Sequence, residues 1–150
     1  MIHKTAIVDS KAKVSSSVKI GAYSVIGPNV EIGDNTIIHS QVNVSGNTKI
    51  GSGNKIYPFA AIGNDPQDLK FDGEDTLTII GDNVVIREFV TINRGTSAYG
   101  KTIVGNNVLL MACTHIAHDC IVGNNVIMAN IATLGAVSYT HLTLPTKRIV

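Results

Sequence analysis

The residues best suited to chemistry in this sequence lie in one short stretch, residues 113–120. It reads Cys-Thr-His-Ile-Ala-His-Asp-Cys, so two histidines, His115 and His118, are followed by a carboxylate, Asp119. A neutral imidazole accepts a proton near neutral pH and also binds metal ions. A direct contact between His118 and Asp119 needs a corner, since adjacent strand residues point to opposite faces.

Three interpretations of this stretch are open from the residues alone. The histidines are surface residues without a role, ligands of a zinc ion, or a general base that takes a proton from an attacking hydroxyl. Two cysteines and two histidines favour zinc, but their spacing matches no established zinc template. The hydrophobic register also turns Thr114, Ile116 and Cys120 inward and leaves His115 and His118 outside the core.

A six-residue repeat must position these side chains. Every sixth residue from the start of the chain to residue 62 is aliphatic. These residues are Ile2, Val8, Val14, Ile20, Ile26, Ile32, Ile38, Val44, Ile50, Ile56 and Ile62. The residues two positions earlier are mostly small or β-branched. Because a strand has a period of two and a helix one of 3.6, this pattern predicts short strands separated by corners.

Glycine often follows the aliphatic residue, at positions 21, 27, 33, 51, 63, 81, 105, 123 and 135. Glycine adopts positive φ at little cost, so we expect these glycines to supply the left-handed backbone of the corners. Asn and Asp tolerate positive φ next best and crowd the same region, as in Asn106-Asn107. A strand that turns every six residues and returns in register is a coil of a parallel β-helix. The sequence therefore predicts an all-β fold.

Two segments interrupt the repeat. Residues 64–79 place Asp68 and Glu74 at aliphatic positions, and residues 93–103 are a shorter excursion. Outside them the register resumes, at Ile80, Ile86, Ile92, Val104, Leu110, Ile116, Val122, Met128 and Leu134. We expect both segments to be loops that leave the coil, and segments of this kind are often functional.

After Gly135 the pattern ends. We predict one repeat domain over residues 1–136 and interpret residues 137–150 as an atypical, non-native tail rather than a capping segment, which would present a polar face. Position 140 carries Thr where the repeat has an aliphatic residue, and no corner glycine follows.

Composition narrows the functional classes. The chain has 150 residues, enough for one domain, and a net charge of +1, which gives no electrostatic case for nucleic acid or an anionic membrane. No apolar run is long enough for a transmembrane segment. Because the repeat begins at Ile2, we expect no signal peptide and a cytoplasmic protein with reduced cysteines. We expect no cofactor and no metal.

Four linked motifs carry a family resemblance. They are Ile56-Tyr57-Pro58-Phe59-Ala60, Gln67-Asp68-Leu69-Lys70, Thr91-Ile92-Asn93-Arg94-Gly95-Thr96 and Thr114 through Cys120. Together they resemble the UDP-N-acetylglucosamine O-acyltransferases of lipid A biosynthesis, which are bacterial hexapeptide-repeat transferases, over residues 1–135. The resemblance implies a left-handed parallel β-helix of triangular section with three hexads per coil. It also implies a homotrimer with each site between two subunits.

The family transfers an (R)-3-hydroxyacyl chain from acyl carrier protein to the 3-hydroxyl of UDP-N-acetylglucosamine. By resemblance, His118 is the general base and His115 its neighbour in the acceptor site. Asp68 and Lys70 match residues that contact the sugar nucleotide, and Asp119 matches an acidic residue linked to the catalytic histidine. These expectations make His118 the residue on which catalysis depends.

The chain departs from the family at two positions and leaves alternatives open. Ala136 replaces a glycine whose backbone N–H serves as oxyanion donor, and Val137 replaces the histidine that follows it. Two enzyme alternatives are the N-acyltransferase of the same pathway and a zinc-binding, carbonic-anhydrase-like hexapeptide-repeat protein. A structural or ice-binding-like solenoid is the non-enzyme alternative, although it should have regular threonines on a flat face and few loops.

Overall fold

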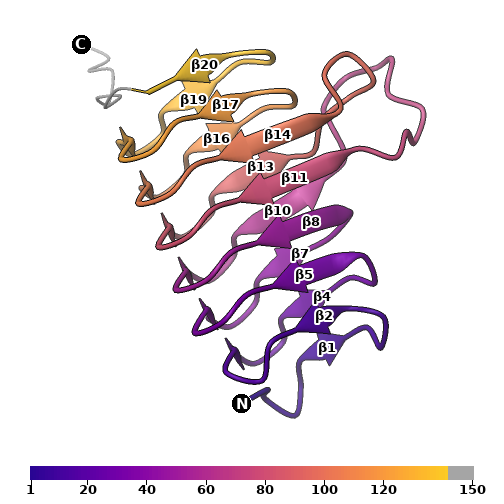
Figure 1. The fold of residues 1–150 in the computed structure, drawn as a ribbon, viewed down its shortest axis with the longest axis vertical. Helices are drawn as coiled ribbons and strands as arrows, with labels where there is room; N and C mark the ends of the chain where they lie inside the picture. The colour runs from indigo at the N-terminus through magenta and orange to yellow at the C-terminus, as the bar shows by residue number, and fades with distance from the viewer. Residues whose placement is uncertain (142–150) are drawn as a thin grey trace.

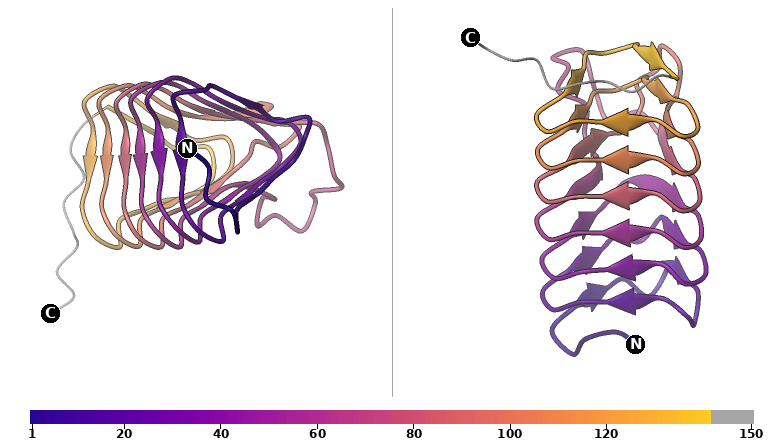
Figure 2. Two further views of the ribbon diagram at one scale, coloured as in Figure 1. Left: turned by 90° about the horizontal axis from the view of Figure 1, so that it is seen from below. Right: turned by 90° about the vertical axis from the view of Figure 1, so that its left-hand side faces the viewer.

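The computed structural model describes residues 1–141, and most of the predicted tail, residues 142–150, lies outside this range. Within residues 1–141 the chain forms short strands and no helix, and every strand pair is parallel. The chain climbs as a prism of triangular section from the N-terminus to the C-terminal coils (Figures 1 and 2). The predicted all-β architecture is confirmed.

Three sheets form the faces of the prism. Sheet 1 contains β1 (Ile7–Val8), β4 (Val25–Ile26), β7 (Asn43–Val44), β10 (Ala61–Asn64), β13 (Thr91–Asn93), β16 (His115–Ile116) and β19 (Thr133–Leu134). Sheet 2 contains β2 (Lys13–Val14), β5 (Val30–Ile32), β8 (Asn47–Ile50), β11 (Leu77–Ile80), β14 (Lys101–Val104), β17 (Ile121–Val122) and β20 (Tyr139–Thr140). Sheet 3 contains β3 (Lys19–Ile20), β6 (Ile37–Ile38), β9 (Lys55–Ile56), β12 (Val85–Ile86), β15 (Leu109–Leu110) and β18 (Ile127–Met128).

The coils stack in a constant register. Val8 pairs with Ile26 and Ile20 pairs with Ile38, so the chain returns to the same place after three hexads. In the right-hand view of Figure 2 the front strands run to the left as the chain rises, which makes the helix left-handed. This hand departs from the usual right-handed crossover between parallel strands. The fold predicted by resemblance is therefore confirmed in its hand and in its three hexads per coil.

The predicted aliphatic column forms the core. From Ile20 onward its members are buried, and the column runs through the centre of the prism to Leu134. Ile2 is exposed and Val8 is half-buried because no coil lies beneath them. Buried hydroxyls fill many of the positions two residues earlier and bond to the carbonyls of corners, as Thr36 Oγ1 does to Gly51 O at 3.0 Å.

The explanation expected for the corner glycines is wrong at most of these positions. Of the predicted set only Gly63 has positive φ, at 81°, and the left-handed residue usually lies two positions later, as at Asn107 with φ 56°. The glycines are instead required by close contact between coils. A Cβ on Gly33 would lie 2.8 Å from the carbonyl carbon of Gly51, which is closer than real side chains approach. Small size, rather than conformational freedom, selects glycine there.

The edge between sheets 2 and 3 carries a polar ladder. Asp82 Oδ1 accepts a hydrogen bond from Ser52 N at 2.7 Å, and Asn106 Oδ1 accepts one from Asp82 N at 2.8 Å. Asn124 Oδ1 continues the series from Asn106 N at 2.7 Å. These side chains satisfy backbone N–H groups that the tight corner would leave unpaired. The Asn and Asp pairs of the sequence thus act both as left-handed residues and as acceptors.

Strand β20 extends sheet 2 beyond residue 136. Gly123 N donates to Thr140 O at 2.6 Å, and Thr140 is buried at the core position of its coil. The described part of the predicted tail therefore follows the helical path as far as residue 141. That residues 137–150 are non-native stays a prediction.

Truncating an isoleucine of sheet 3 should cost much more stability where the side chain faces the core than where it faces solvent. Ile86 is fully buried, whereas Ile127 on the outer row is 41% exposed. We expect Ile86→Ala to lower the free energy of unfolding by about 2–5 kcal/mol, since it removes buried methyl groups and leaves a cavity. The control Ile127→Ala should cost less than about 1 kcal/mol. Urea unfolding followed by circular dichroism measures both, and equal losses would contradict the assigned core.

Candidate active site

The loops and the His118 corner lie along one edge of the prism, where sheet 1 passes into sheet 2. Residues 65–76 join β10 to β11, and residues 94–100 join β13 to β14. The flanking strands take up the ends of the ranges 64–79 and 93–103 predicted for these loops. The next connection, from β16 to β17, is the corner 117–120, which carries His118 and Asp119. Both loops protrude at this edge in Figures 1 and 2.

The corner turns two neighbouring side chains toward each other. Asp119 has a left-handed backbone, with φ 61°, so its side chain does not point away from that of His118 as it would in a strand. His118 Nδ1 lies 2.8 Å from Asp119 Oδ2. His118 and Asp119 are therefore in direct contact, and the corner that this contact requires is present. Inside this corner Ile116 and Cys120 face the core as predicted.

The Asp119 carboxylate is fully enclosed and surrounded by donors. Its side chain has 0% exposed surface. Oδ1 accepts from Thr96 N at 2.9 Å, while Oδ2 accepts from the Thr96 hydroxyl and from His118 Nδ1. Burial raises the pKa of this carboxyl, but the hydrogen bonds from Thr96 and His118 outweigh it and bring the pKa below its ordinary value. Asp119 is therefore an anion at neutral pH.

The Asp119 anion determines which nitrogen of His118 carries the proton. An ionised carboxylate only accepts hydrogen bonds, so Nδ1 must be the donor. In the neutral ring Nε2 then keeps its lone pair. The His118 side chain is 15% exposed, and Nε2 lies 4.0 Å from Asp68 Oδ2. A ring held in this way presents an accepting nitrogen to the space beside the first loop.

Asp68 and Lys70 lie on the loop 65–76. Asp68 closes its own turn, because Lys70 N donates to Asp68 Oδ1 at 3.0 Å and Phe71 N donates to Asp68 O at 3.0 Å. The other carboxylate oxygen of Asp68 faces His118. Lys70 is exposed. The structure thus brings Asp68 to His118 within one chain, and it leaves the Lys70 side chain available to solvent.

Arg94 connects the two loops. Its guanidinium pairs with Asp65 Oδ1 at 3.0 Å and lies over the ring of Phe71, 5.0 Å from the centroid. A second link is the hydrogen bond from Thr76 Oγ1 to Gly95 O at 2.5 Å. Loops without secondary structure lose conformational entropy when they are ordered, and these contacts offset that loss. Arg94, to which the sequence assigned no catalytic role, is an anchor for both loops.

His115 occupies a different position from His118. It lies on β16 in the outer row of sheet 1, where its register partners are Thr91 in the coil below and Thr133 in the coil above. Its Nδ1 lies 2.6 Å from Thr91 Oγ1. Burial lowers the pKa of His115 below its ordinary value, although an interaction with the backbone of Thr91 acts in the opposite direction. His115 is therefore suited to hydrogen bonding in its neutral form.

Two threonines near Asp119 were not predicted as functional residues. Thr96 makes the two contacts described above, and Thr102 Oγ1 accepts from Asp119 N at 2.9 Å. Thr96 lies within a motif that carried the family resemblance, so its presence there was the available signal. Its contact with Asp119 spans 23 positions of sequence and depends on the path of the loop 94–100. No spacing rule could reveal that contact.

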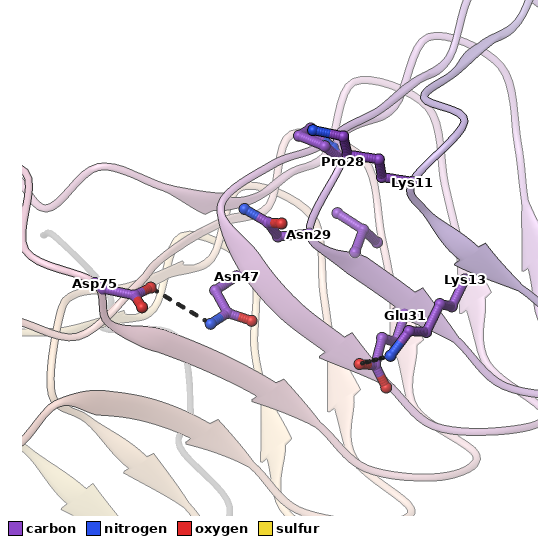
Figure 3. Close-up of a pocket in the computed structure, with 8 residues that line it drawn as sticks. Lys11, Lys13, Pro28, Asn29, Glu31, Asn47 and Asp75 are labelled. Carbon is purple, nitrogen blue, oxygen red and sulfur yellow. Dashed lines mark hydrogen bonds and ion pairs between the residues drawn. The ribbon is translucent and has the colours of Figure 1, made fainter.

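A surface hollow of about 270 Å³ lies beside the N-terminal strands of sheet 2, away from His118 (Figure 3). Its charged groups are largely paired: Lys13 Nζ lies 3.3 Å from Glu31 Oε1, and Asn47 Nδ2 donates to Asp75 Oδ1 at 3.5 Å. The lining residues include no histidine, cysteine or serine. The hollow has no imidazole to act as a general base and none of the site residues predicted from the sequence, so the candidate site remains at the His118 corner.

Residues 1–141 contain neither a metal-binding cluster within the chain nor a membrane-spanning helix. This part of the chain contains no group of three or more His, Cys, Asp or Glu side chains placed to hold a metal ion. The zinc alternative would therefore need ligands from another subunit. No helix in the same range is long and apolar enough to cross a membrane.

Three segments of the chain match one known protein family. Residues 11–46, 29–64 and 101–136 match the family described as bacterial transferase hexapeptide (six repeats). The chain belongs to this hexapeptide transferase family. Two curated members are informative, and both bear the name acyl-(acyl-carrier-protein)–UDP-N-acetylglucosamine O-acyltransferase. The protein of Syntrophobacter fumaroxidans is 50% identical over 89% of this chain, and that of Herminiimonas arsenicoxydans is 56% identical over 95%.

Solved structures of family members have the same fold. LpxA from Acinetobacter baumannii superposes with a TM-score of 0.91 and 47% identity, over 92% of this chain and 54% of that one. The UDP-N-acetylglucosamine acyltransferase LpxA from Bacteroides fragilis gives a TM-score of 0.90 and 48% identity, over 93% and 55%. The chain covers 52% of the Syntrophobacter relative and 54% of the Herminiimonas relative. It thus spans about half the length of the relatives that it matches.

Replacing Asp119 should show, through the pH dependence of stability, that its carboxylate is ionised in the folded protein. Asp119→Asn is expected to lower the free energy of unfolding at pH 7, because the amide nitrogen cannot accept the hydrogen bonds that the carboxylate receives. The folded-state pKa of Asp119 is depressed, so its contribution is complete above the ordinary value of 3.8 and is lost as the pH falls through the lower folded value. The stability difference between wild type and variant should therefore shrink on acidification.

Urea unfolding at pH 7 and pH 3 measures this difference. Asp72→Asn, at an exposed aspartate of the first loop, is the matched control and should show little change in stability at pH 7. A stability difference for Asp119→Asn that stays constant or grows at low pH would contradict an ionised, hydrogen-bonded Asp119.

Proposed function

We propose that the protein is an acyltransferase that moves a 3-hydroxyacyl chain from acyl carrier protein to the 3-hydroxyl of UDP-N-acetylglucosamine. The observation that carries this proposal is the His118–Asp119 pair beside Asp68, within a chain about half identical to proteins named for that reaction. The motifs that contain these residues are shared with the family by resemblance. The N-acyltransferase alternative has no such support among the two curated relatives described above.

His118 would act as the general base. Its Nε2 takes the proton of the sugar hydroxyl as the oxygen attacks the thioester carbonyl carbon. The imidazolium that forms is stabilised by the Asp119 anion, which already holds Nδ1 at 2.8 Å. The tetrahedral intermediate then expels the thiolate of the carrier, and His118 returns the proton to it. Every proton that leaves the hydroxyl therefore reaches the departing sulfur through one ring nitrogen.

The oxyanion of the intermediate needs a hydrogen-bond donor, and we assign it to the backbone N–H of Ala136. The corner 135–138 lies directly above the His118 corner, because Val137 N donates to His118 O at 3.1 Å. Within residues 1–141 the Ala136 N–H has no acceptor, and Ala136 is exposed. A backbone donor does not depend on the side chain, so alanine in place of glycine preserves it.

Substrate binding would use the residues around this corner. The carboxylate of Asp68 can accept hydrogen bonds from sugar hydroxyls near His118, and the exposed ammonium of Lys70 complements an anionic sugar nucleotide. Neutral His115, held by Thr91, supplies a further hydrogen-bonding group on sheet 1. A cytoplasmic location, expected from the sequence, is part of this proposal.

Self-association is the remaining part of the proposal. The edge between sheets 3 and 1 bears four exposed apolar side chains at the left-handed corner position, which we call the apolar ridge: Tyr23, Phe59, Phe89 and Ile131. Gln41 lies between the first two, and Cys113 lies between the last two. Phe59 and Phe89 stack with their ring centroids 5.0 Å apart. Exposed apolar side chains that gather on one edge are typical of an interface. We propose that the apolar ridge contributes to a homotrimer.

Removing the base should abolish turnover without abolishing binding. We expect His118→Ala to lower kcat for acyl transfer by at least about 100-fold, since general-base catalysis contributes this much or more, and to retain binding of UDP-N-acetylglucosamine. Transfer of a labelled acyl chain and isothermal titration measure the two quantities. Lys55→Ala, on the outer row of sheet 3, is the control.

The assay should include both this chain and a chimera in which residues 1–135 precede the remaining half of the Herminiimonas relative, because the chain spans about half of that protein. Full activity of the His118→Ala chimera would remove His118 as the base. A chimera without any acyl transfer would remove the proposed reaction.

The apolar ridge can be tested by the state of association. Phe89→Glu places a charge in the centre of the ridge and should shift the protein toward monomer. Ile121→Glu, on sheet 2 opposite that edge, should leave the assembly unchanged. Sedimentation velocity measures the mass of each variant. Monomeric wild type, or loss of assembly only in the Ile121 variant, would contradict this role of the ridge.

A further inference from the structure

The proposed mechanism leaves one buried polar group on the second loop without a role, the side chain of Thr96. Thr96 is 6% exposed and contacts both oxygens of Asp119. Its N–H donates to Oδ1 at 2.9 Å and its hydroxyl donates to Oδ2. Ala98 N in turn donates to Thr96 Oγ1 at 3.2 Å. A single residue thus holds the carboxylate at two points, and we call this pair of hydrogen bonds the clamp on Asp119.

The direction of the Thr96 hydroxyl follows from its partners. The hydroxyl has one proton, and the N–H of Ala98 occupies an acceptor position on Oγ1. Because the Asp119 anion can only accept, the hydroxyl proton must point to Oδ2. Two donors from one residue fix the plane of the carboxylate, which in turn fixes the direction in which Oδ2 faces His118 Nδ1.

Thr96 is itself fixed by the loop and by the adjacent coil. Gly100 N donates to Thr96 O at 2.7 Å, which closes the loop upon itself. Gly95 is held on both sides, since its N–H donates to Leu77 O at 3.1 Å and its carbonyl accepts from Thr76 Oγ1 at 2.5 Å. The clamp on Asp119 therefore exists before any substrate binds, and ordering it costs nothing at the moment of reaction.

A second carboxylate, that of Asp68, competes with Asp119 for the proton on the His118 ring. The charged groups that face the His118 ring within residues 1–141 are Asp119 on its own corner and Asp68 from the first loop. Asp119 attracts a proton on Nδ1, whereas Asp68, 4.0 Å from Nε2, attracts a proton on Nε2. The tautomer of a neutral imidazole is set by the hydrogen bonds that its two nitrogens make. Only the tautomer with a bare Nε2 can accept a proton from a substrate at that position.

We propose that Thr96 is a positioning residue that, by clamping Asp119, holds His118 in the tautomer with its proton on Nδ1 and its lone pair on Nε2. Thr96 has no hydrogen bond with His118 and acts through Asp119. The consequence for catalysis rests on the proposed acyltransferase function. The consequence for the tautomer concerns the free protein and does not depend on it.

The direct test is the ¹⁵N NMR spectrum of the histidine side chains, with His118 assigned by its loss in His118→Ala. At a pH at which the ring is neutral, wild type should show the His118 proton on Nδ1. Thr96→Val keeps the branched shape but removes the hydroxyl donor, and the signals should move toward the Nε2-protonated form. Thr96→Ser restores the donor and should restore the wild-type spectrum.

The matched control is Thr36→Val, which removes a buried hydroxyl that donates to Gly51 O and accepts from Asn54 N but has no hydrogen bond with Asp119 or with either loop. It should leave the His118 tautomer unchanged. An unchanged spectrum in Thr96→Val, or the same change in Thr36→Val, would overturn the proposal. The first result would mean that Asp119 needs no clamp, and the second that a general loss of stability is responsible.

Kinetics add an independent readout in a preparation with acyl transfer activity. Thr96→Val should lower kcat about tenfold and leave KM for UDP-N-acetylglucosamine unchanged, because a hydrogen bond to a charged group is lost and no substrate contact is removed. Thr96→Ser should recover most of the rate. A rise in KM with unchanged kcat would assign Thr96 to binding and contradict the inference. A tautomer change without any change in kcat would instead count against His118 as the base.

Discussion

The structure depends on the hydrogen bonds between successive coils. In each sheet a strand donates to and accepts from the strand one coil away, as Gly105 N does to Val122 O at 2.8 Å, so every coil must repeat the path of the coil beneath it. Most of these strands contain only two residues and would not be stable alone. Their stability comes from stacking, which buries one continuous column of aliphatic side chains. Extra residues are tolerated only where they leave the coil without shifting the register.

The two loops meet this condition by leaving from the same edge. Strands β10 and β11 flank the first loop, and both pair with their counterparts in the adjacent coils. Residues on loops of successive coils are separated by the spacing of one coil, so they can contact each other and the corner above them. Arg94, with its contacts to Asp65 and Phe71, turns two separate excursions into one ordered wall. The position of the candidate site is thus a consequence of where the repeat allows insertions.

The period of six was sufficient to predict the short strands, the core and the places where the loops leave the coil, because each depends only on which residues are apolar. The three sheets were predicted from the family resemblance. Ile86 and Ile116 could be placed in the core without any three-dimensional information. The reason given for the corner glycines was wrong, since the approach of neighbouring coils at Gly33 is a property of stacking and not of one chain segment. The two bonds from Thr96 to Asp119 could not be predicted either. They depend on the conformation of a loop with no period of its own.

The local geometry of the solenoid also explains why the candidate dyad consists of neighbours in sequence. Along a strand, adjacent side chains point to opposite faces, so a histidine on the surface would be followed by a residue in the core. At the corner, the left-handed conformation of Asp119 lets both His118 and Asp119 leave the backbone on the same side of the turn. Asp119 pays a conformational cost for this, which its hydrogen bonds from Thr96 and His118 offset.

Two neighbouring corners, one earlier in the same coil and one directly above Asp119, show what the loops add. Cys113 and Val137 have φ values of 63° and 63°, close to that of Asp119, so the backbone conformation alone recurs throughout the prism. Both are exposed, whereas the Asp119 side chain is enclosed. The difference is the loop 94–100, which covers Asp119 with Thr96. A corner supplies the direction of two side chains, and an inserted loop supplies the enclosure in which a carboxylate and an imidazole interact strongly.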